Sequence, residues 1–306
     1  MIKVTFKGVD ITDSVSINRC YHDMYSEKQA DTLHIRFNDS ENLWDRWAPQ
    51  VGDEIAVQYG SIGTGKMYVE HVSPENGLYG IWALSVPPTF KEIKNKAWQK
   101  VKLRQMGAEI AGNHGLTFES FGVTDVLYDY ILQDRINDFE FFSMRCALEG
   151  CAFLVYDGKL ILYNERNIEA STPSESIEIG VDGNYRYFDN SNLLYGSCVI
   201  EKGLYVGEYS AGNGISRIFI PTWNINVSTQ EEANRFAQNM LRYANKDAYH
   251  GYIRREITPA YAAASMADLK NTRVPSWNGK VFINHIRNDY ASGMSKIFFR
   301  RPLEGY

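Results

Sequence analysis

Polar and apolar residues alternate through most of the first 90 residues, and this period of two is the strongest constraint on the fold. Successive side chains of a β-strand point to opposite faces, so the alternation predicts strands that bury one face. Six such segments lie at residues 4–6, 9–17, 33–37, 55–59, 67–72 and 78–84. Polar or glycine-containing turns separate them, and a Pro-Pro pair follows the last one. Six short strands in succession predict a small antiparallel barrel or sandwich over residues 1–90.

The period changes after residue 90 to that of amphipathic helices. One predicted helix has an apolar face made of Leu103, Met106, Ile110 and Ala111. A second helix is predicted from about 138 to 149, with the Asn137 side chain as its N-cap. A hairpin is predicted over residues 151–163, because an Asp-Gly pair of the type I′ class separates two apolar runs. Residues 91–166 are therefore expected to form an α/β insert.

Strand patterns return after a connector at residues 167–176. They lie near residues 176–179, 185–188, 198–200, 215–220, 280–286 and 296–299. One strongly amphipathic helix interrupts them at 229–246, with Ser228 and Glu231 as its expected capping box. Residues 167–306 are therefore expected to form a second β-barrel that includes this helix. The predicted fold class is α+β, mainly β, with two antiparallel β-barrels flanking an α/β insert.

Composition removes several classes of protein. No run of about 18 apolar residues is present, so no membrane partner is expected. A second lysine breaks the apolar residues of the N-terminus, which argues against a signal peptide and for cytoplasmic synthesis without export. A net charge of −5 and a pI of about 5.8 argue against specific nucleic-acid binding. The four scattered cysteines are expected to be buried thiols of a reducing compartment.

The sharpest apparent motif is the G-x4-G-K pattern of residues 60–66. A phosphate-binding loop needs Ser or Thr as the next residue and a helix after it. Met67 follows instead, and the next residues continue as a strand. A glycine-rich hairpin is therefore favoured over a nucleotide site, and no cofactor is expected.

A second candidate is the cationic stretch at residues 91–104, which holds six Lys and Arg with one Glu among them. It could meet an acidic partner or nucleic acid, but a solvated helix face is the favoured interpretation.

No set of residues predicts catalysis or metal binding. The six histidines lack ligand spacing, and His114 beside a helix end suits a structural role. Cys146 and Cys151 have no second cysteine pair, so zinc is not expected. No G-x-S-x-G elbow occurs, and the carboxylates of Asp138, Glu140, Glu231 and Glu232 lie where helix first turns favour acids anyway. The protein is therefore not expected to be an enzyme, and no catalytic, metal or cofactor residue is assigned.

The central third of the chain resembles a known family. The succession Ala97-Trp98, His114-Gly115-Leu116, Gln133-Asp134, Asp138-Phe139, Gly150 and Gly158-Lys159-Leu160 is similar to that of the phage late control gene D family. These are the baseplate hub proteins of contractile tails, related to the hub part of type VI secretion spikes. The N-terminal stretch, with Leu33-His-Ile-Arg-Phe37 and Gly52-Asp53-Glu54-Ile55, resembles a tail-tube-like barrel. The helix at 229–246 and a final strand near 280–287 follow in the order of the family, so the resemblance covers most of the chain.

The resemblance implies a structural baseplate hub. Each subunit of a homotrimer would contribute two tube-like barrels, so that three chains present a pseudo-sixfold ring to the hexameric tail tube. The implied partners are the tail tube protein, a spike or tail-tip protein, and the tape measure and other baseplate proteins. The implied location is the baseplate of a virion or phage-tail-like particle, assembled in the bacterial cytoplasm. Phage and bacteriocin particles both stay open, as do a cell-wall hydrolase and a carbohydrate-binding tail component as alternative functions.

Aromatic residues and glycine-rich turns suggest where such a ring would make contact. Aromatic side chains are enriched at protein interfaces, although the core is the other place for them. The predicted interface elements are a loop with Trp44 and Trp47, a hairpin from 61 to 68, and residues 204–209 of the second barrel. The residues assigned to the interface are Trp44, Trp47, Ser61, Ile62, Thr64, Tyr68, Leu204, Tyr205 and Tyr209.

Overall fold

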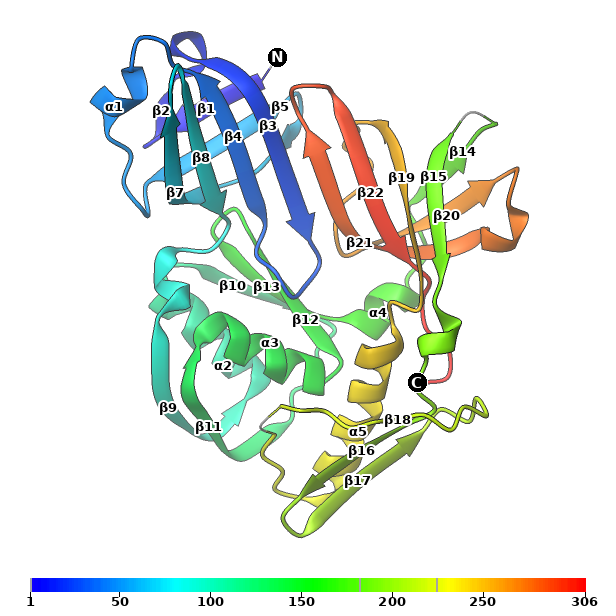
Figure 1. Cartoon of the computed structure of the whole chain (residues 1–306). Coiled ribbons are helices and arrows are strands. Elements are labelled where there is room, and N and C mark those ends of the chain that lie inside the picture. Colours follow the sequence, from blue (N-terminus) through cyan, green and yellow to red (C-terminus); the bar gives the residue numbers. More distant parts are fainter. Residues whose placement is uncertain (1, 182, 224) are drawn as a thin grey trace.

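A computed structural model describes residues 2–181, 183–223 and 225–306. The chain is mainly β, with a large sheet above and helices α2 to α5 below it (Figure 1). No helix in the described ranges is long and apolar enough to cross a membrane.

The N-terminal residues form strands, as the alternation predicted. They are β1 (Ile2–Phe6), β2 (Val9–Asp10), β3 (Ser16–Tyr25), β4 (Thr32–Asn38), β5 (Glu54–Tyr59), β6 (Ile62–Gly63), β7 (Met67–Glu75) and β8 (Leu78–Leu84), with helix α1 (Leu43–Trp47) between β4 and β5. The alternating apolar residues point to one side, where Val4, Phe37 and Ile81 are fully buried in a common core. We call these strands the first β unit.

The central residues form an α/β layer below the sheet (Figure 1). Its elements are β9 (Ile93–Lys102), α2 (Leu103–Asn113), β10 (Thr117–Phe121), β11 (Leu127–Asn137), α3 (Asp138–Leu148), β12 (Cys151–Tyr156), β13 (Lys159–Asn164) and α4 (Glu165–Ala170). The Asn137 side chain accepts a hydrogen bond from the Glu140 N–H at 2.8 Å, so the predicted cap is confirmed. The hairpin turn is confirmed too, since Asp157 and Gly158 both have positive φ, as a type I′ turn requires.

The remaining elements divide between the two layers. They are β14 (Glu175–Ile179), β15 (Asn184–Asp189), β16 (Ser197–Lys202), β17 (Tyr205–Ser210), β18 (Ile218–Phe219), α5 (Gln230–Asn245), β19 (Tyr249–Glu256), β20 (Ser265–Asn271), β21 (Gly279–Asp289) and β22 (Met294–Arg300). We call β14, β15 and β19–β22 the second β unit. The N-cap of α5 is Thr229, which accepts from the Glu232 N–H, so the predicted capping box was one residue too early.

Helix α5 does not pack in the second β unit, to which the sequence assigned it. Its buried residues Phe236, Met240 and Leu241 share one core with α2, α3 and β12. Strands β16 and β17 pack on the same helix, so residues 197–223 and 225–245 extend the central layer. The predicted apolar stripe of α5 is buried, but a stripe does not specify which surface covers it.

A buried ionic network fastens the central layer to the second β unit. Arg300 of β22 donates to Glu165 Oε1 at 3.2 Å and also to Glu169, both of α4. Arg242 of α5 donates to Glu169 at 2.7 Å, and Lys246, the residue directly after α5, donates to Glu165 at 3.0 Å. All five side chains are nearly fully buried, so each charge depends on the others for compensation.

The large sheet repeats one order of four strands. Its path runs β15-β19-β22-β21 and then β3-β4-β8-β7, before β5, β1 and β2. In each unit the four strands have the same relative places in the chain, and every neighbouring pair in this run is antiparallel. The outer strands correspond as well. In the first β unit β5 pairs with β7 and β1, and in the second β unit β20 pairs with β21 and β14 in the same way. One difference is that β14 and β20 are parallel, whereas β1 and β5 are antiparallel. The chain therefore contains two copies of one topology that no sequence repeat revealed.

Candidate interaction surfaces

The two β units meet along one strand pair. Residues 21–25 of β3 pair antiparallel with residues 285–289 of β21. The Asp23 carboxylate contacts His285 Nε2 at 2.6 Å and accepts from Arg287 Nε at 2.8 Å. Burial opposes the ionisation of Asp23, yet these two partners hold its pKa below the usual value. The junction is therefore a hydrogen-bonded continuation of one sheet.

Strands β15 and β7 of the large sheet each carry backbone groups that face no other strand in the described ranges. Strand β15 ends the sheet path and pairs only with β19. Strand β7 pairs with β8 along its length, but on its other side only Met67 and Tyr68 pair with a strand, which is β5. Residues 71–75 of β7 thus have one side without a strand. Open edges of this kind are templates for pairing with another chain.

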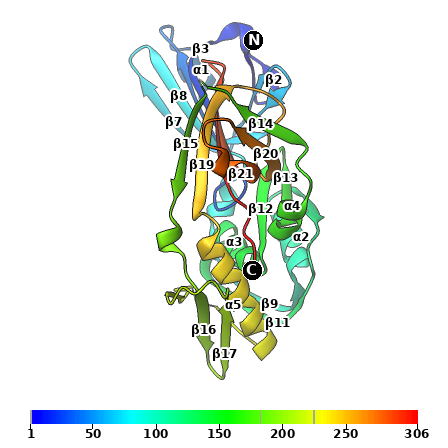
Figure 2. The same cartoon turned by 90° about the vertical axis from the view of Figure 1, so that its right-hand side faces the viewer.

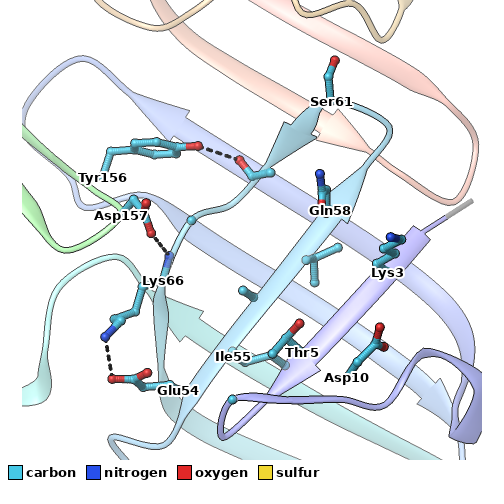
Figure 3. Close-up of a pocket in the computed structure, with 15 residues that line it drawn as sticks. Lys3, Thr5, Asp10, Glu54, Ile55, Gln58, Ser61, Lys66, Tyr156 and Asp157 are labelled. Carbon is cyan, nitrogen blue, oxygen red and sulfur yellow. Dashed lines mark hydrogen bonds and ion pairs between the residues drawn. The ribbon is translucent and has the colours of Figure 1, made fainter.

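A shallow polar groove of about 650 Å³ lies on the first β unit, over β1, β5 and the hairpin of residues 60–66 (Figure 3). Two of its charged groups form an ion pair, since Lys66 Nζ lies 2.9 Å from Glu54 Oε1. The Lys66 backbone N–H donates to the Asp157 carboxylate at 3.1 Å. The hairpin leads directly into β7 and no helix follows it. The glycine-rich hairpin favoured from the sequence is confirmed.

Gly65 brings this hairpin against the β12–β13 turn of the central layer. Its φ is +63°, and a Cβ built on it would lie 2.9 Å from the Asp157 Cα. The Tyr156 hydroxyl also donates to the Gly63 carbonyl at 3.4 Å (Figure 3). The hairpin therefore joins two layers of the chain.

The cationic stretch at residues 91–104 was expected to be a solvated helix face, but most of it is a strand. Residues 93–102 are strand β9, whose Trp98 and Val101 are buried against the central core. Three of the cations form ion pairs: Lys91 with Glu70, Lys94 with Asp138, and Lys96 with Glu109. Half of the cationic charge is thus compensated within the chain, which leaves a weaker basic surface than the sequence indicated.

His114 has the structural environment that the sequence predicted. Its Nδ1 lies 2.7 Å from Thr89 Oγ1, and its Nε2 lies 2.7 Å from Asp138 Oδ2. Burial opposes ionisation of Asp138, but hydrogen bonds from His114, Gln133 and Lys94 hold its pKa well below the usual value. The cluster ties the end of α2 to the start of α3. Among the residues that the structure describes, no three His, Cys, Asp or Glu side chains are arranged to hold a metal ion.

Two of the residues assigned to the interface belong to the core, and their assignment was wrong. Trp44 is 1% exposed, because α1 turns its ring inward against Phe37 and Tyr79. Thr64 is fully buried, and its hydroxyl accepts from the Val57 N–H at 3.0 Å. Aromatic content and a loop-like context did not distinguish an interface from the core.

The other assigned residues lie at the surface or partly so, in two separate places. On the first β unit, Ser61 is exposed, whereas Trp47, Ile62 and Tyr68 are half-buried. The remaining three are Leu204, Tyr205 and Tyr209. They lie on the β16–β17 hairpin at the bottom of Figure 1, in the central layer and not in the second β unit. Leu204, in the turn, is 95% exposed.

Sequence comparisons identify no relatives: no protein-family model matches the chain, and no curated protein matches it. Solved structures do match it over its whole length. A 43 kDa tail protein of prophage MuSo2 from Shewanella oneidensis has a TM-score of 0.77 at 13% identity, covering 98% of both chains. A tail protein from Neisseria meningitidis MC58 has a TM-score of 0.77 at 9% identity, covering 98% of this chain and 96% of its own.

A third match comes from a secretion system. It is an E. coli component of the type VI secretion system, itself similar to the T4 tail proteins gp27 and gp5, with a TM-score of 0.64 at 10% identity. The alignment covers 99% of this chain and 78% of that one. The resemblance predicted from sequence is confirmed at the level of the fold: over its full length, this chain has the fold of phage tail proteins and of a related type VI secretion component.

Proposed function

We propose that this chain is a structural hub of the baseplate of a contractile phage tail or of a phage-tail-like bacteriocin. In this role it forms a homotrimer and joins the tail tube to the central spike or tail-tip protein. The observation that carries the proposal is the repeated four-strand order of the large sheet. Two equivalent β units per chain give a trimer six similar units, which is the number needed to meet a hexameric tube.

The two β units are proposed as the tail-tube-like barrels. Residues 1–90 form the first and residues 91–166 the insert. The proposed second barrel, within 167–306, is limited to strands β14, β15 and β19 to β22, because β16, β17 and α5 pack with the insert.

The partners follow from this role: other copies of the chain, the tail tube protein, the spike or tail-tip protein, and the tape measure and other baseplate proteins. The exposed tip at Leu204 is proposed as one contact with such a component. Trp47, Ser61, Ile62, Tyr68, Tyr205 and Tyr209 stay proposed contacts, while Trp44 and Thr64 are removed. The particle is assembled in the bacterial cytoplasm, and the hub acts by geometry without catalysis.

The first test is the absolute mass of the purified chain by light scattering over a concentration series. A stable species of three times 35.0 kDa is the expected result. A monomer at every concentration contradicts the proposal. Release of fragments from purified peptidoglycan, or binding to a glycan array, would instead support a cell-wall hydrolase or a carbohydrate-binding tail component.

A further inference from the structure

The repeat within the sheet indicates how one copy of the chain meets the next. The path places β3 of the first β unit beside β21 of the second. By position in the repeat, β15 is the counterpart of β3, and β7 is the counterpart of β21. We infer that β15 of one subunit pairs antiparallel with residues 71–75 of β7 of the next subunit. This inference rests on the proposed trimer and identifies its contact surface.

An irregularity shared by β7 and β21 aligns the two strands. The register of β7 against β8 shifts between Val69 and His71, and that of β21 against β22 shifts between Ile283 and His285. The histidine after each shift stacks on an aromatic ring of the neighbouring strand. His71 lies 4.5 Å from Trp82 with ring planes 16° apart, and His285 lies 4.5 Å from Phe298 with planes 15° apart. His71 is therefore the counterpart of His285.

The partners of the aligned strands differ only at the open edge. On β21, residues 279–283 pair with β20 and residues 285–289 pair with β3. On β7, Met67 and Tyr68 pair with β5, whereas residues 71–75 have no strand on that side in the described ranges. The place that β3 occupies on β21 is thus open on β7, and His71, Pro74 and Glu75 are exposed there.

Strand β15 has the matching open edge. Trp82 pairs with His34 of β4, which pairs with Tyr21 of β3. In the second β unit, Phe298 pairs with Tyr252 of β19, which pairs with Arg186 of β15. Arg186 is therefore the counterpart of Tyr21. In Figure 2, β15 runs along one margin of the molecule and the β7–β8 hairpin projects from its upper part.

These counterparts fix the register between subunits. Tyr21 faces Asp289 across the junction within the chain. The counterpart of Asp289 is Glu75, since each lies four residues after its histidine. Glu75 of one subunit therefore faces Arg186 of the next, and Ser73 faces Phe188. In this register Arg186 would join Glu75, which already pairs with Arg36 of its own chain, and a second opposite charge beside that carboxylate is compatible with the pairing.

Pro74 is compatible with the pairing but shortens the ladder. Ser26 donates to Asn284, and Tyr290 donates to Cys20, across the junction within the chain. Hydrogen-bonded pairs alternate in an antiparallel ladder, so Asn288, the counterpart of Pro74, is in a hydrogen-bonded pair. Pro74 can accept there but not donate, which removes one bond. A proline at an open edge also limits uncontrolled association.

The contact is head to tail, because each chain offers one β15 edge and one β7 edge. Such contacts generate a closed ring when the rotation between subunits closes. A symmetric dimer made of two identical patches would not use these two edges against each other.

Cysteine cross-linking tests the pairing. Glu75→Cys with Arg186→Cys places one thiol on each edge, at exposed positions. Because hydrogen-bonded and non-hydrogen-bonded pairs alternate along the ladder, positions 75 and 186 form a non-hydrogen-bonded pair. The Cα atoms of such a pair lie about 4.5 Å apart, within reach of a disulfide. The four native cysteines are buried and should not interfere. Mild oxidation is expected to give covalent dimers and trimers on a non-reducing gel, and a mixture of the two single variants is expected to give dimers only.

The matched control is Glu75→Cys with Asn190→Cys, four residues out of register and about 13 Å away along the strand. It should not cross-link. A protein that scatters as a trimer but gives no cross-link at positions 75 and 186 overturns the inferred pairing and leaves the proposed hub intact. Cross-linking of the control pair alone overturns the register. A monomer without cross-links counts against both proposals.

Discussion

Tyr25 and His285, 260 residues apart in the chain, stack with ring centroids 4.4 Å apart and planes 8° from parallel. They lie on β3 and β21, the strand pair that joins the two β units. Next to this stack, Asp23 gathers His285 and Arg287 around one carboxylate. The junction that the proposed ring would repeat between subunits is therefore held by side chains as well as by the backbone ladder.

Replacing Asp23 tests how much the side chains of this junction contribute. Asp23→Ala removes the acceptor for His285 and Arg287, and hydrogen bonds to charged groups contribute about 1.5 to 3 kcal/mol. The free energy of unfolding in urea is expected to fall by about that amount. Glu178→Ala, at a carboxylate whose side chain is 77% exposed, is the control and should change it by less than about 0.5 kcal/mol. Equal losses in the two variants would contradict this role for Asp23.

Local structure was largely predictable from the sequence, but the pairing of distant strands was not. The cap at Asn137 and the Asp157-Gly158 turn depend on neighbouring residues, and both were found where predicted. Strand β9 was misread because its alternating lysines resemble a solvated helix face, while its partner β11 lies 25 or more residues further on.

The repeated strand order of the two β units could not be recognised in the sequence for a related physical reason. Trp82 and Phe298 hold equivalent places against His71 and His285, so similar packing is achieved with different side chains. The open edges carry no sequence signal either, since polar and apolar residues alternate along an edge strand as they do along any other strand. Burial of Trp44 depends on how α1 is oriented, which the composition of the loop did not specify.

Acid is expected to destabilise the fold through His22. Its ring is fully buried, with Nδ1 2.9 Å from the Tyr290 hydroxyl, and burial lowers its pKa to about 4. The unfolded chain takes up a proton near pH 6.5, whereas the folded chain resists it. Stability should therefore fall as the pH drops from about 6.5 to about 4, by about 3 kcal/mol from this residue. Urea unfolding at several pH values measures this, and in His22→Asn that part of the loss should disappear. An unchanged pH profile in the variant would rule His22 out as the cause.

Asp31 should have the opposite pH dependence. Its side chain is 5% exposed, and burial raises its pKa to about 7, although the Tyr25 N–H donates to it at 2.8 Å. The neutral carboxyl is favoured in the fold, so its contribution is complete below about pH 4 and is lost as the pH rises through 7. Asp31→Asn keeps an acceptor for Tyr25 without a charge. It is expected to stabilise the protein at pH 8 by about 2 to 4 kcal/mol and to change little at pH 4.5. A stabilisation of the same size at both pH values would contradict the titration of Asp31.

Alanine substitutions at Gly65 and Gly60 distinguish the cost of backbone strain from the cost of close contact with a neighbouring segment. Both have positive φ, at +63° and +60°, so an alanine at either position costs about 1 to 2 kcal/mol of conformational strain. Only at Gly65 would the new Cβ meet the backbone of Asp157, because nothing lies within 4 Å of the Cβ position at Gly60. Gly65→Ala is therefore expected to lower the free energy of unfolding by about 1 to 3 kcal/mol more than Gly60→Ala, since forcing atoms into a packed contact adds that much. The contact joins the hairpin to the β12–β13 turn, so amide hydrogen exchange at Lys66, whose N–H donates to Asp157, should also rise in Gly65→Ala alone. Equal destabilisation by the two variants, with unchanged exchange at Lys66, would show that the hairpin does not need this approach to the central layer.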